Sequence, residues 1–398
     1  RPGDDLARFS ARPDTMEAET RSQILETVDK LARERVAPRA AEIDAADEFP
    51  RDLYDAAGKL GLFGLWIPEA YGGIGPDMIA PLLISERLSR ASAAFALIFS
   101  NCGDACTPIV HAGSEELKRR WLPGIAAGKL IPCFALSEPG AGSDAASIAT
   151  QARREGDHYV INGRKCWCTN GAVGDVFVVF AKTDPAGGNR GVSAFAVPRD
   201  TPGFSRGRNE NLLGLRGSPT TQLSFDNVRI PAGFRLGEEG EGFKIAMISL
   251  DEARLNCSAM ATGVARAALD LAVAYAKERI QFGKPIIQHQ GLQFLLAEDA
   301  ALLAAAISLW ESAMKMLETE RGRRASTYAA MTKLVATDMA MRVTTNAVQA
   351  LGGNGLTRDY PVERMMRDVK AFQIFDGTNQ IQKMLIGRHL EKAGLPFA

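Results

Sequence analysis

The stretch Phe134-Ala135-Leu136-Ser137-Glu138-Pro139-Gly140-Ala141-Gly142-Ser143-Asp144 lies where the residue pattern of this chain changes. Upstream of it, apolar residues such as Ile24, Val28 and Leu31 recur at the spacing of a helix face. The stretch itself starts like a strand and ends in a tight turn rich in glycine, and short strand-like segments follow it. It therefore predicts a β domain that begins behind a helical one.

The strand pattern continues to about Gly242. Tyr159-Val160-Ile161 runs into Asn162-Gly163, a strong hairpin signal, before Arg164 to Thr169 returns as a second strand. Val176 to Phe180 is β-branched and aromatic, and two further strand-like segments end at Pro198 and Pro231. Short strands joined by glycine-rich turns predict a compact, barrel-like β domain.

Long, alanine-rich amphipathic segments fill the rest of the chain, at Ala259 to Arg279, Leu292 to Leu317 and Ser326 to Leu351. This pattern is typical of a four-helix bundle, where alanine lets helices approach closely. The expected fold class is therefore mainly α with a central β domain. We expect an N-terminal helical domain at residues 1–131, a middle β-barrel-like domain at 132–242 and a C-terminal four-helix bundle at 243–398.

Length and charge limit the class of function. A chain of 398 residues is too long for one small core, so two or three domains are expected. Basic and acidic residues both number 47, and this balance argues against a broad nucleic-acid footprint. The longest apolar run, Ala300 to Ile307, is too short to span a bilayer, so we expect no membrane partner. Arg1 to Thr15 has no apolar h-region and is interpreted as a lead-in rather than a signal peptide.

The six cysteines do not form a disulfide framework or a metal site by their spacing. Cys166-Trp167-Cys168 is not a redox C-x-x-C motif, and no second Cys/His pair completes a zinc site. Cys102 and Cys106 share a predicted helix face, where buried small hydrophobes are the favoured interpretation. These features predict free thiols, no metal and a cytoplasmic, reducing compartment.

A second informative stretch, Gln373-Ile374-Phe375-Asp376-Gly377-Thr378-Asn379-Gln380-Ile381-Gln382, lies near the end of the chain. It places one carboxylate between an aromatic residue and a glycine, followed by side-chain amides and a hydroxyl. An acid flanked in this way can be held beside a flat ligand, because glycine allows a close backbone approach. Asp376 is therefore a candidate acid–base residue.

Other segments have a structural interpretation as well as a functional one. The glycines between Ser137 and Ser143 can present N–H groups to a phosphate or ring edge, or form a simple turn. Trp167 and Thr169 share one strand face, either as core residues or beside a flat cofactor. Arg279 suits a diphosphate, or a solvated helix end. Gln349 to Gly355 is either a ligand contact or a helix C-cap with a glycine turn.

Together the motifs at residues 137–144 and 373–382 resemble those of the acyl-CoA dehydrogenase family of flavoenzymes, and the resemblance runs over nearly the whole chain. It implies FAD as the cofactor, with Trp167 stacked near the isoalloxazine and Thr169 donating to its N5. The residues from Arg279 onward would meet the adenosine end of FAD, across a subunit contact. The full set of residues implied for FAD is Phe134, Leu136, Ser137, Trp167, Thr169, Arg279, Gln281, Phe282, His289, Gln290, Gln349, Gly352, Gly353, Thr378 and Gln380.

The resemblance also implies the reaction, which is α,β-dehydrogenation of an acyl-CoA thioester. Asp376 would abstract the α-proton while a hydride passes to flavin N5. The family usually has glutamate here, and some branches place it at the position of Ala253, which leaves Asp376 as the base in this chain. The residues implied for substrate binding are Ser143, Asp251, Arg254 and Gly377.

Aspartate is one methylene shorter than glutamate, and this departure keeps other substrates open. A nitroalkane-oxidase-like flavoenzyme also uses aspartate, although Ser143 and the intact 137–144 motif favour a thioester. A dehydrogenase of acyl groups on a carrier protein is a second alternative. A nucleic-acid-binding flavoprotein relative is a third, and zero net charge weighs against it. The expected partners are electron-transfer flavoprotein as electron acceptor and further copies of the chain, as a homotetramer.

Overall fold

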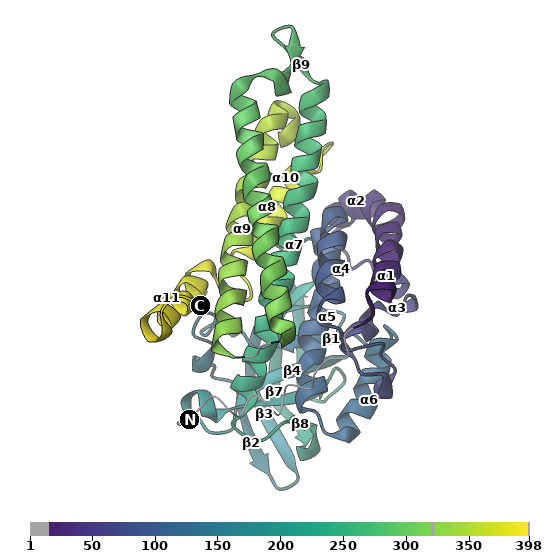
Figure 1. Ribbon diagram of the computed structural model, residues 1–398. Coiled ribbons are helices and arrows are strands. Elements are labelled where there is room, and N and C mark those ends of the chain that lie inside the picture. Colours follow the sequence, from purple (N-terminus) through teal and green to yellow (C-terminus); the bar gives the residue numbers. More distant parts are fainter. Residues whose placement is uncertain (1–15, 320–321, 397–398) are drawn as a thin grey trace.

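In the computed structural model, helices from both ends of the chain pack against one sheet at the lower end of the molecule (Figure 1). Residues 16–319 and 322–396 are described, so the interpretation of Arg1 to Thr15 as a lead-in lies outside them. The N-terminal helices pack beside the sheet and beside the lower half of the long C-terminal helices. The α7, α8 and α9 helices rise well beyond the sheet, and α11 packs against α9 at its side.

The N-terminal part is helical, and its most buried element is α5. Along α5 nearly every side chain from Ala93 to Ile109 is inaccessible to solvent, because α4, α6, α7 and β1 all pack against it. Ser92 caps the helix by accepting a hydrogen bond from the Phe95 N–H. The elements are α1 (Ala18–Leu31), η2 (Ala32–Val36), η3 (Ala37–Arg39), α2 (Ala40–Ala46), α3 (Arg51–Lys59), η4 (Leu62–Trp66), η5 (Glu69–Tyr71), α4 (Ala80–Ala91), α5 (Ala93–Ala112) and α6 (Glu115–Ala126).

The central sheet has strand order β6-β7-β3-β2-β4-β5-β8, with β1 paired in parallel to β4. Its core includes Phe177, Phe180 and Phe195, all fully buried. The strands are β1 (Pro132–Ala135), β2 (Gln151–Glu155), β3 (His158–Thr169), β4 (Val176–Lys182), β5 (Val192–Pro198), β6 (Phe204–Asn209), β7 (Thr220–Pro231) and β8 (Arg235–Leu236). Short helical turns lie at η6 (Ala145–Ser147), η7 (Gly188–Gly191) and η8 (Ala232–Phe234).

The predicted hairpin at Asn162-Gly163 is wrong, because β3 continues straight through it and pairs with β7 on both sides. A register shift between Ile161 and Gly163 shows a β-bulge instead. Gly163 has φ +149°, and a Cβ there would lie 2.4 Å from Thr150 Oγ1, so the position requires glycine for close approach. The hairpin turn falls earlier, at Gly156 between β2 and β3.

The C-terminal helices form a bundle in which α7, α8 and α9 run side by side (Figure 1). Their bounds are α7 (Gly242–Glu278), α8 (Gln290–Thr319), α9 (Arg323–Leu351), α10 (Val362–Phe372) and α11 (Asn379–Ala393). The α7–α8 tip contains β9 (Ile280–Gln281), β10 (Lys284–Pro285) and η9 (Ile286–Gln288), and η10 (Gly352–Leu356) ends α9. Helices flank a central β region at both ends of the chain, so the predicted fold class is confirmed.

Three described helices are long and apolar enough to cross a membrane by length and composition: α5, α7 and α8. The α8 helix is therefore more apolar over its length than the uninterrupted run from Ala300 to Ile307 indicated. In α5 and α7 most of this apolar window is buried inside the fold, at 89% and 67%. In α8 only 22% of the window is buried, so this helix presents an apolar face outward.

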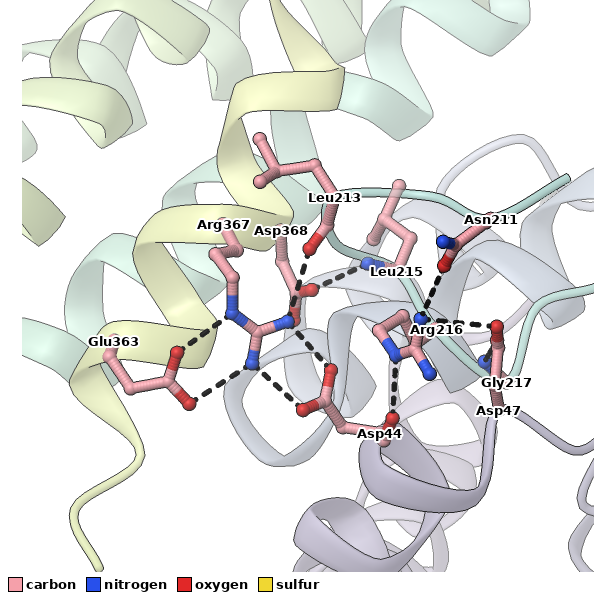
Figure 2. Close-up of polar contacts among 10 residues, drawn as sticks. All are labelled: Asp44, Asp47, Asn211, Leu213, Leu215, Arg216, Gly217, Glu363, Arg367 and Asp368. Carbon is pink, nitrogen blue, oxygen red and sulfur yellow. Dashed lines mark hydrogen bonds and ion pairs between the residues drawn. The ribbon is translucent and has the colours of Figure 1, made fainter. Parts of the chain in front are cut away.

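A polar network joins the N-terminal helices, the sheet and α10 (Figure 2). The Arg367 guanidinium on α10 donates to both carboxylate oxygens of Asp44 on α2, at 2.8 Å each. It also donates to Glu363 and to the carbonyl of Leu213. These charge-assisted bonds fix α10 against the loop that precedes β7.

The second half of the same network fixes that loop (Figure 2). The Leu215 N–H donates to Asp368 Oδ1 at 2.6 Å, next to Arg367 on α10. Arg216 donates to the carbonyl of Asp44 at 2.8 Å and pairs with Asp47. Because α10 leads directly into the segment that contains Asp376, the network also fixes the position from which this segment starts.

Candidate functional site

Asp376 lies in a left-handed turn between α10 and α11. Its φ is +54°, an uncommon conformation for a residue with a Cβ, and Gly377 follows with φ +84°. The backbone angle favours glycine there, and a Cβ on Gly377 would lie 2.8 Å from Gln382 Nε2, so that side chain would have to shift. Thr378 then caps α11 by accepting from the Ile381 N–H. A strained turn of this kind costs roughly 1–3 kcal/mol and persists only where its surroundings hold it.

The surroundings of Asp376 tune its acidity. Burial raises the pKa of its carboxyl to about 6, while the nearby charges of Lys333 and Arg254 lower it. A carboxyl group with a pKa near 6 is deprotonated at neutral pH yet basic enough to accept a proton. This is the range expected of a general base.

Two further carboxyl groups face this region from other helices. Burial, and then the charges of Asp376 and Glu252, raise the pKa of Asp104 on α5 well above its usual value. Asp104 Oδ1 is inaccessible to solvent and has no hydrogen-bond partner in the described part of the chain. Glu252 on α7 accepts a bond from Thr107 Oγ1 at 3.2 Å. The site therefore gathers three acids, of which the sequence singled out Asp376.

Arg254 on α7 is buried and close to this cluster of acids. It forms an ion pair with Asp251, which also accepts a hydrogen bond from Ser326. Its Nε is buried and has no partner among residues 16–319 and 322–396. The structure therefore places Arg254 beside Asp376 with one donor to spare, and its predicted contact with substrate stays a prediction.

On the β side, a buried ion pair shapes the glycine-rich turn. The fully buried Lys165 on β3 donates to the Leu136 carbonyl at 2.9 Å and to Glu138 Oε1 at 2.7 Å. Glu138 also accepts from the Ala149 N–H at 2.6 Å and the Thr150 N–H at 3.1 Å. With its base fixed in this way, the turn from Pro139 to Asp144 leaves its glycines and Ser143 at the surface.

Trp167 reaches the surface beside this turn because β3 is irregular there. A register shift between Lys165 and Cys168, together with φ +57° at Trp167, marks a bulge. The indole is 60% exposed while its neighbours Cys166 and Cys168 are buried. After the bulge burial still alternates, with Trp167 exposed, Cys168 buried and Thr169 half-buried, and the shared strand face of Trp167 and Thr169 stays a prediction.

The remaining predicted residues lie far from Trp167 within the same chain. Gln281 and Phe282 lie at the tip between α7 and α8, at the end of the bundle away from the sheet (Figure 1). Phe282 is 94% exposed there. Asn354, just after the glycines at the end of α9, bonds Tyr275 near the end of α7. The residues at the far end are thus Arg279, Gln281, Phe282, His289, Gln290, Gln349, Gly352 and Gly353.

Lys333 is the residue near Asp376 that sequence reasoning missed. It lies on α9 in the same face as Ala329, Ala336 and Ala340, all fully buried. A lysine within the apolar stripe of an amphipathic helix is a signal available in the sequence, because a buried ammonium needs partners.

Comparison with known proteins identifies the family. Residues 18–129 match the model of the acyl-CoA dehydrogenase N-terminal domain, 133–228 the middle domain and 240–391 the C-terminal domain. The chain is 45% identical over 367 residues to cyclohex-1-ene-1-carbonyl-CoA dehydrogenase of Geobacter metallireducens, covering 92% of this chain and 96% of the relative.

Two solved structures superpose over nearly the whole chain. Butyryl-CoA dehydrogenase from Megasphaera elsdenii has a TM-score of 0.91 and 38% identity, with 95% of this chain and 100% of that chain covered. A chain solved in work on the electron transferring flavoprotein of Acidaminococcus fermentans has a TM-score of 0.91 and 41% identity, with the same coverage. The protein is therefore an oxidoreductase, and it belongs to the acyl-CoA dehydrogenase family.

Members of this family use FAD, so the predicted cofactor is confirmed. The β-side residues fit a flavin in their chemistry. Trp167 offers an exposed aromatic face, and the hydroxyl groups of Ser137 and Thr169 form no hydrogen bond within the described part of the chain. Free donors and an exposed indole beside a glycine-rich turn match a flat ring with polar edges.

Proposed function

We propose that this protein is an FAD-dependent acyl-CoA dehydrogenase in which Asp376 removes the α-proton of an acyl-CoA thioester. The observation that supports this most directly is the carboxyl group of Asp376, held in a left-handed turn with a pKa raised to about 6. A carboxyl with this pKa can remain ionised at neutral pH and still accept a proton from carbon. Asp104 has less support as the base, because burial and neighbouring charges favour its neutral form.

The chain's own residues would orient the thioester. The backbone N–H of Asp376 donates to no protein acceptor among the described residues, so it can donate to the thioester carbonyl and acidify the α-proton. The spare Nε–H of Arg254 adds positive charge nearby. Ser143, exposed in the glycine turn, is suited to contact the CoA part of the substrate. Bound FAD supplies the acceptor for the hydride from the β-carbon.

We further propose that the acyl group contains a ring. The relative from Geobacter metallireducens is named for a cyclohexene carboxylic thioester. Asn101 and Asp104 lie one turn apart on α5, and each has a buried side-chain oxygen without a partner in the described residues. Aspartate at position 376 is shorter than glutamate, so the substrate Cα must lie closer to the carboxylate than the Cα of a straight acyl chain would. A misplacement of about 1 Å can cost about 100-fold in rate.

Assembly and electron transfer complete the proposal. Exposed Phe282 and the outward apolar face of α8 support a homotetramer in which the α7–α8 tip serves the FAD site of a neighbouring subunit. Electron-transfer flavoprotein is the proposed electron acceptor, supported by the similarity to the chain from the Acidaminococcus fermentans work. The six cysteines are buried and free, which supports a reducing, cytoplasmic compartment.

The test is an anaerobic titration of the flavin-loaded protein with butyryl-CoA, cyclohex-1-ene-1-carbonyl-CoA and a nitroalkane, following bleaching of the flavin absorbance. We expect a thioester to bleach the flavin, with the cyclic one fastest. An Asp376→Asn variant should retain FAD and bind the thioester but lose at least about 100-fold in the rate of bleaching. Asp200→Asn, at a side chain that is 89% exposed, serves as the control. Bleaching by the nitroalkane alone would refute the proposal.

A further inference from the structure

The turn that contains Asp376 rests on a buried lysine. Lys333 on α9 is fully inaccessible to solvent. Its Nζ donates to the carbonyl of Gly377 at 2.9 Å and to Asn379 Oδ1 at 2.9 Å. Both acceptors are neutral, and among the described residues no carboxylate forms an ion pair with Lys333 within 4.0 Å. An ammonium in this position costs free energy unless a negative charge lies nearby.

The negative charges near Lys333 come from two places. Burial lowers the pKa of Lys333, and the charges of Asp376 and Asp338 act in the opposite direction. Asp338, also on α9, is engaged by side-chain amides, because Gln373 and Asn379 donate to its Oδ1 at 2.6 Å and 2.7 Å. Of these two carboxylates, Asp376 has the larger effect on the pKa of Lys333.

A neutral donor acts on the same carbonyl. Gln382 Nε2 on α11 donates to Gly377 O at 2.7 Å and to Asp376 O at 3.2 Å. One backbone carbonyl thus accepts from a charged side chain and from an uncharged one. The two donors fix the peptide planes of Asp376 and Gly377 in their left-handed conformation. Replacing each donor in turn therefore separates the effect of the hydrogen bond to the Gly377 carbonyl from the effect of the positive charge.

We propose that Lys333 is a positioning residue for Asp376, which holds the turn through the Gly377 carbonyl and keeps the Asp376 carboxylate ionised for proton abstraction. The inference rests on the proposed role of Asp376 as the base. It assigns Lys333 no contact with substrate or cofactor. Its effect passes through the turn and through the electrostatic field at the carboxylate.

The other charged and titratable groups around Asp376 do not replace Lys333. From α5 comes Asp104, and from α7 come Glu252, Arg254 and the Cys257 thiol. Arg254 is the second cation that lowers the pKa of Asp376, but it is paired with Asp251 and forms no hydrogen bond with the turn. Burial favours the protonated form of Asp376, and the charge of Lys333 opposes it. Removing the charge of Lys333 should therefore raise the pKa of Asp376.

The experiment compares Lys333→Met with Gln382→Met in the flavin-loaded protein. The rate of flavin reduction by a thioester is measured against pH by stopped-flow absorbance. In Lys333→Met we expect the acidic limb to move to higher pH by about one unit, since an opposite charge nearby is worth about 1–3 units. Well below the limb, such a shift lowers the rate about tenfold. Gln382→Met loses a donor to the same carbonyl without losing charge, so its rate should fall while its limb stays in place.

An equal shift in both variants would overturn the inference, and so would an unmoved limb in Lys333→Met together with an unshifted titration of the Asp376 carboxyl. If Lys333→Met is not recovered folded, Lys333→Gln removes the charge and retains a donor, and the same shift is expected. Lys333→Arg keeps the charge, so the acidic limb of its pH–rate profile should stay at the wild-type pH.

Infrared difference spectroscopy separates this inference from the proposed function. The carboxyl titration of Asp376 is obtained by subtracting the spectrum of Asp376→Asn from that of the wild-type protein at each pH. The same subtraction in the Lys333→Met background gives the titration without the charge of Lys333. A shifted titration with an unmoved rate limb would mean that Asp376 is not the base, while the effect of Lys333 on it stands. An unshifted titration would overturn the inference about Lys333 and leave the proposed function intact.

Discussion

Asp368 is buried at the junction between α10 and the sheet, and its replacement by asparagine should change how stability depends on pH. Burial raises the pKa of its carboxyl to about 7, although the hydrogen bond from the Leu215 N–H and the charge of Arg364 act against this. The side chain is 4% exposed, and its Oδ1 accepts the Leu215 N–H at 2.6 Å (Figure 2). Asparagine retains an oxygen for this bond but has no proton to lose.

The sign of the effect follows from proton binding in the two states. Between pH 4 and 7 the folded protein holds the proton of Asp368, whereas the unfolded chain, at the ordinary value of 3.8, has released it. The free energy of unfolding therefore falls as the pH rises through this window, and the loss is complete above pH 7. Three pKa units at 1.36 kcal/mol each give an upper limit of about 4 kcal/mol for this group.

The assay is urea unfolding of Asp368→Asn and of the wild-type protein at pH 5 and pH 8, both saturated with FAD. Other titrating groups contribute to both proteins, so the difference between them isolates Asp368. We expect the variant to gain about 2–3 kcal/mol relative to wild type between pH 5 and pH 8, because only the two units from pH 5 to pH 7 fall in this range. Asp200→Asn, at an exposed side chain, should follow the wild type. A constant difference between Asp368→Asn and wild type would refute the argument.

Two further predictions concern the polar network and the α7–α8 tip. Asp44→Ala should lower the free energy of unfolding by about 3 kcal/mol, because it leaves the Arg367 guanidinium, 16% exposed, without its bidentate partner. The control is Asp52→Ala, which removes the exposed pair of Asp52 with Arg39. In the same denaturation assay it should lower the free energy of unfolding by less than about 1 kcal/mol. Phe282→Ser, at a side chain that is 94% exposed, should leave monomer stability within about 0.5 kcal/mol but release FAD and shift sedimentation to smaller species, and unchanged flavin content and assembly would count against the subunit-shared site.

Much of the fold could be predicted from the sequence because its signals are local. Apolar spacing at Ile24, Val28 and Leu31 reports a helix face, and the β-branched run at Val176 to Phe180 reports a buried strand. The hairpin predicted at Asn162-Gly163 was wrong because the glycine there is required by a tertiary contact and not by a turn. Gly163 is required by the close approach of Thr150 from outside the strand, and a turn signal read from two residues cannot reveal that contact. The domain boundaries after residues 131 and 242 remain predictions.

The sequence by itself determined the type of chemistry and the residue proposed to perform it, because a carboxylate followed by glycine and helix-capping residues is a contiguous motif. It could not determine how that carboxylate is held. Lys333 and Arg254 come from two different helices, and they act on Asp376 only after packing brings those helices together. Charge acts through space rather than along the chain, so the protonation of Asp376 and the strain of its turn were decided by the tertiary structure alone.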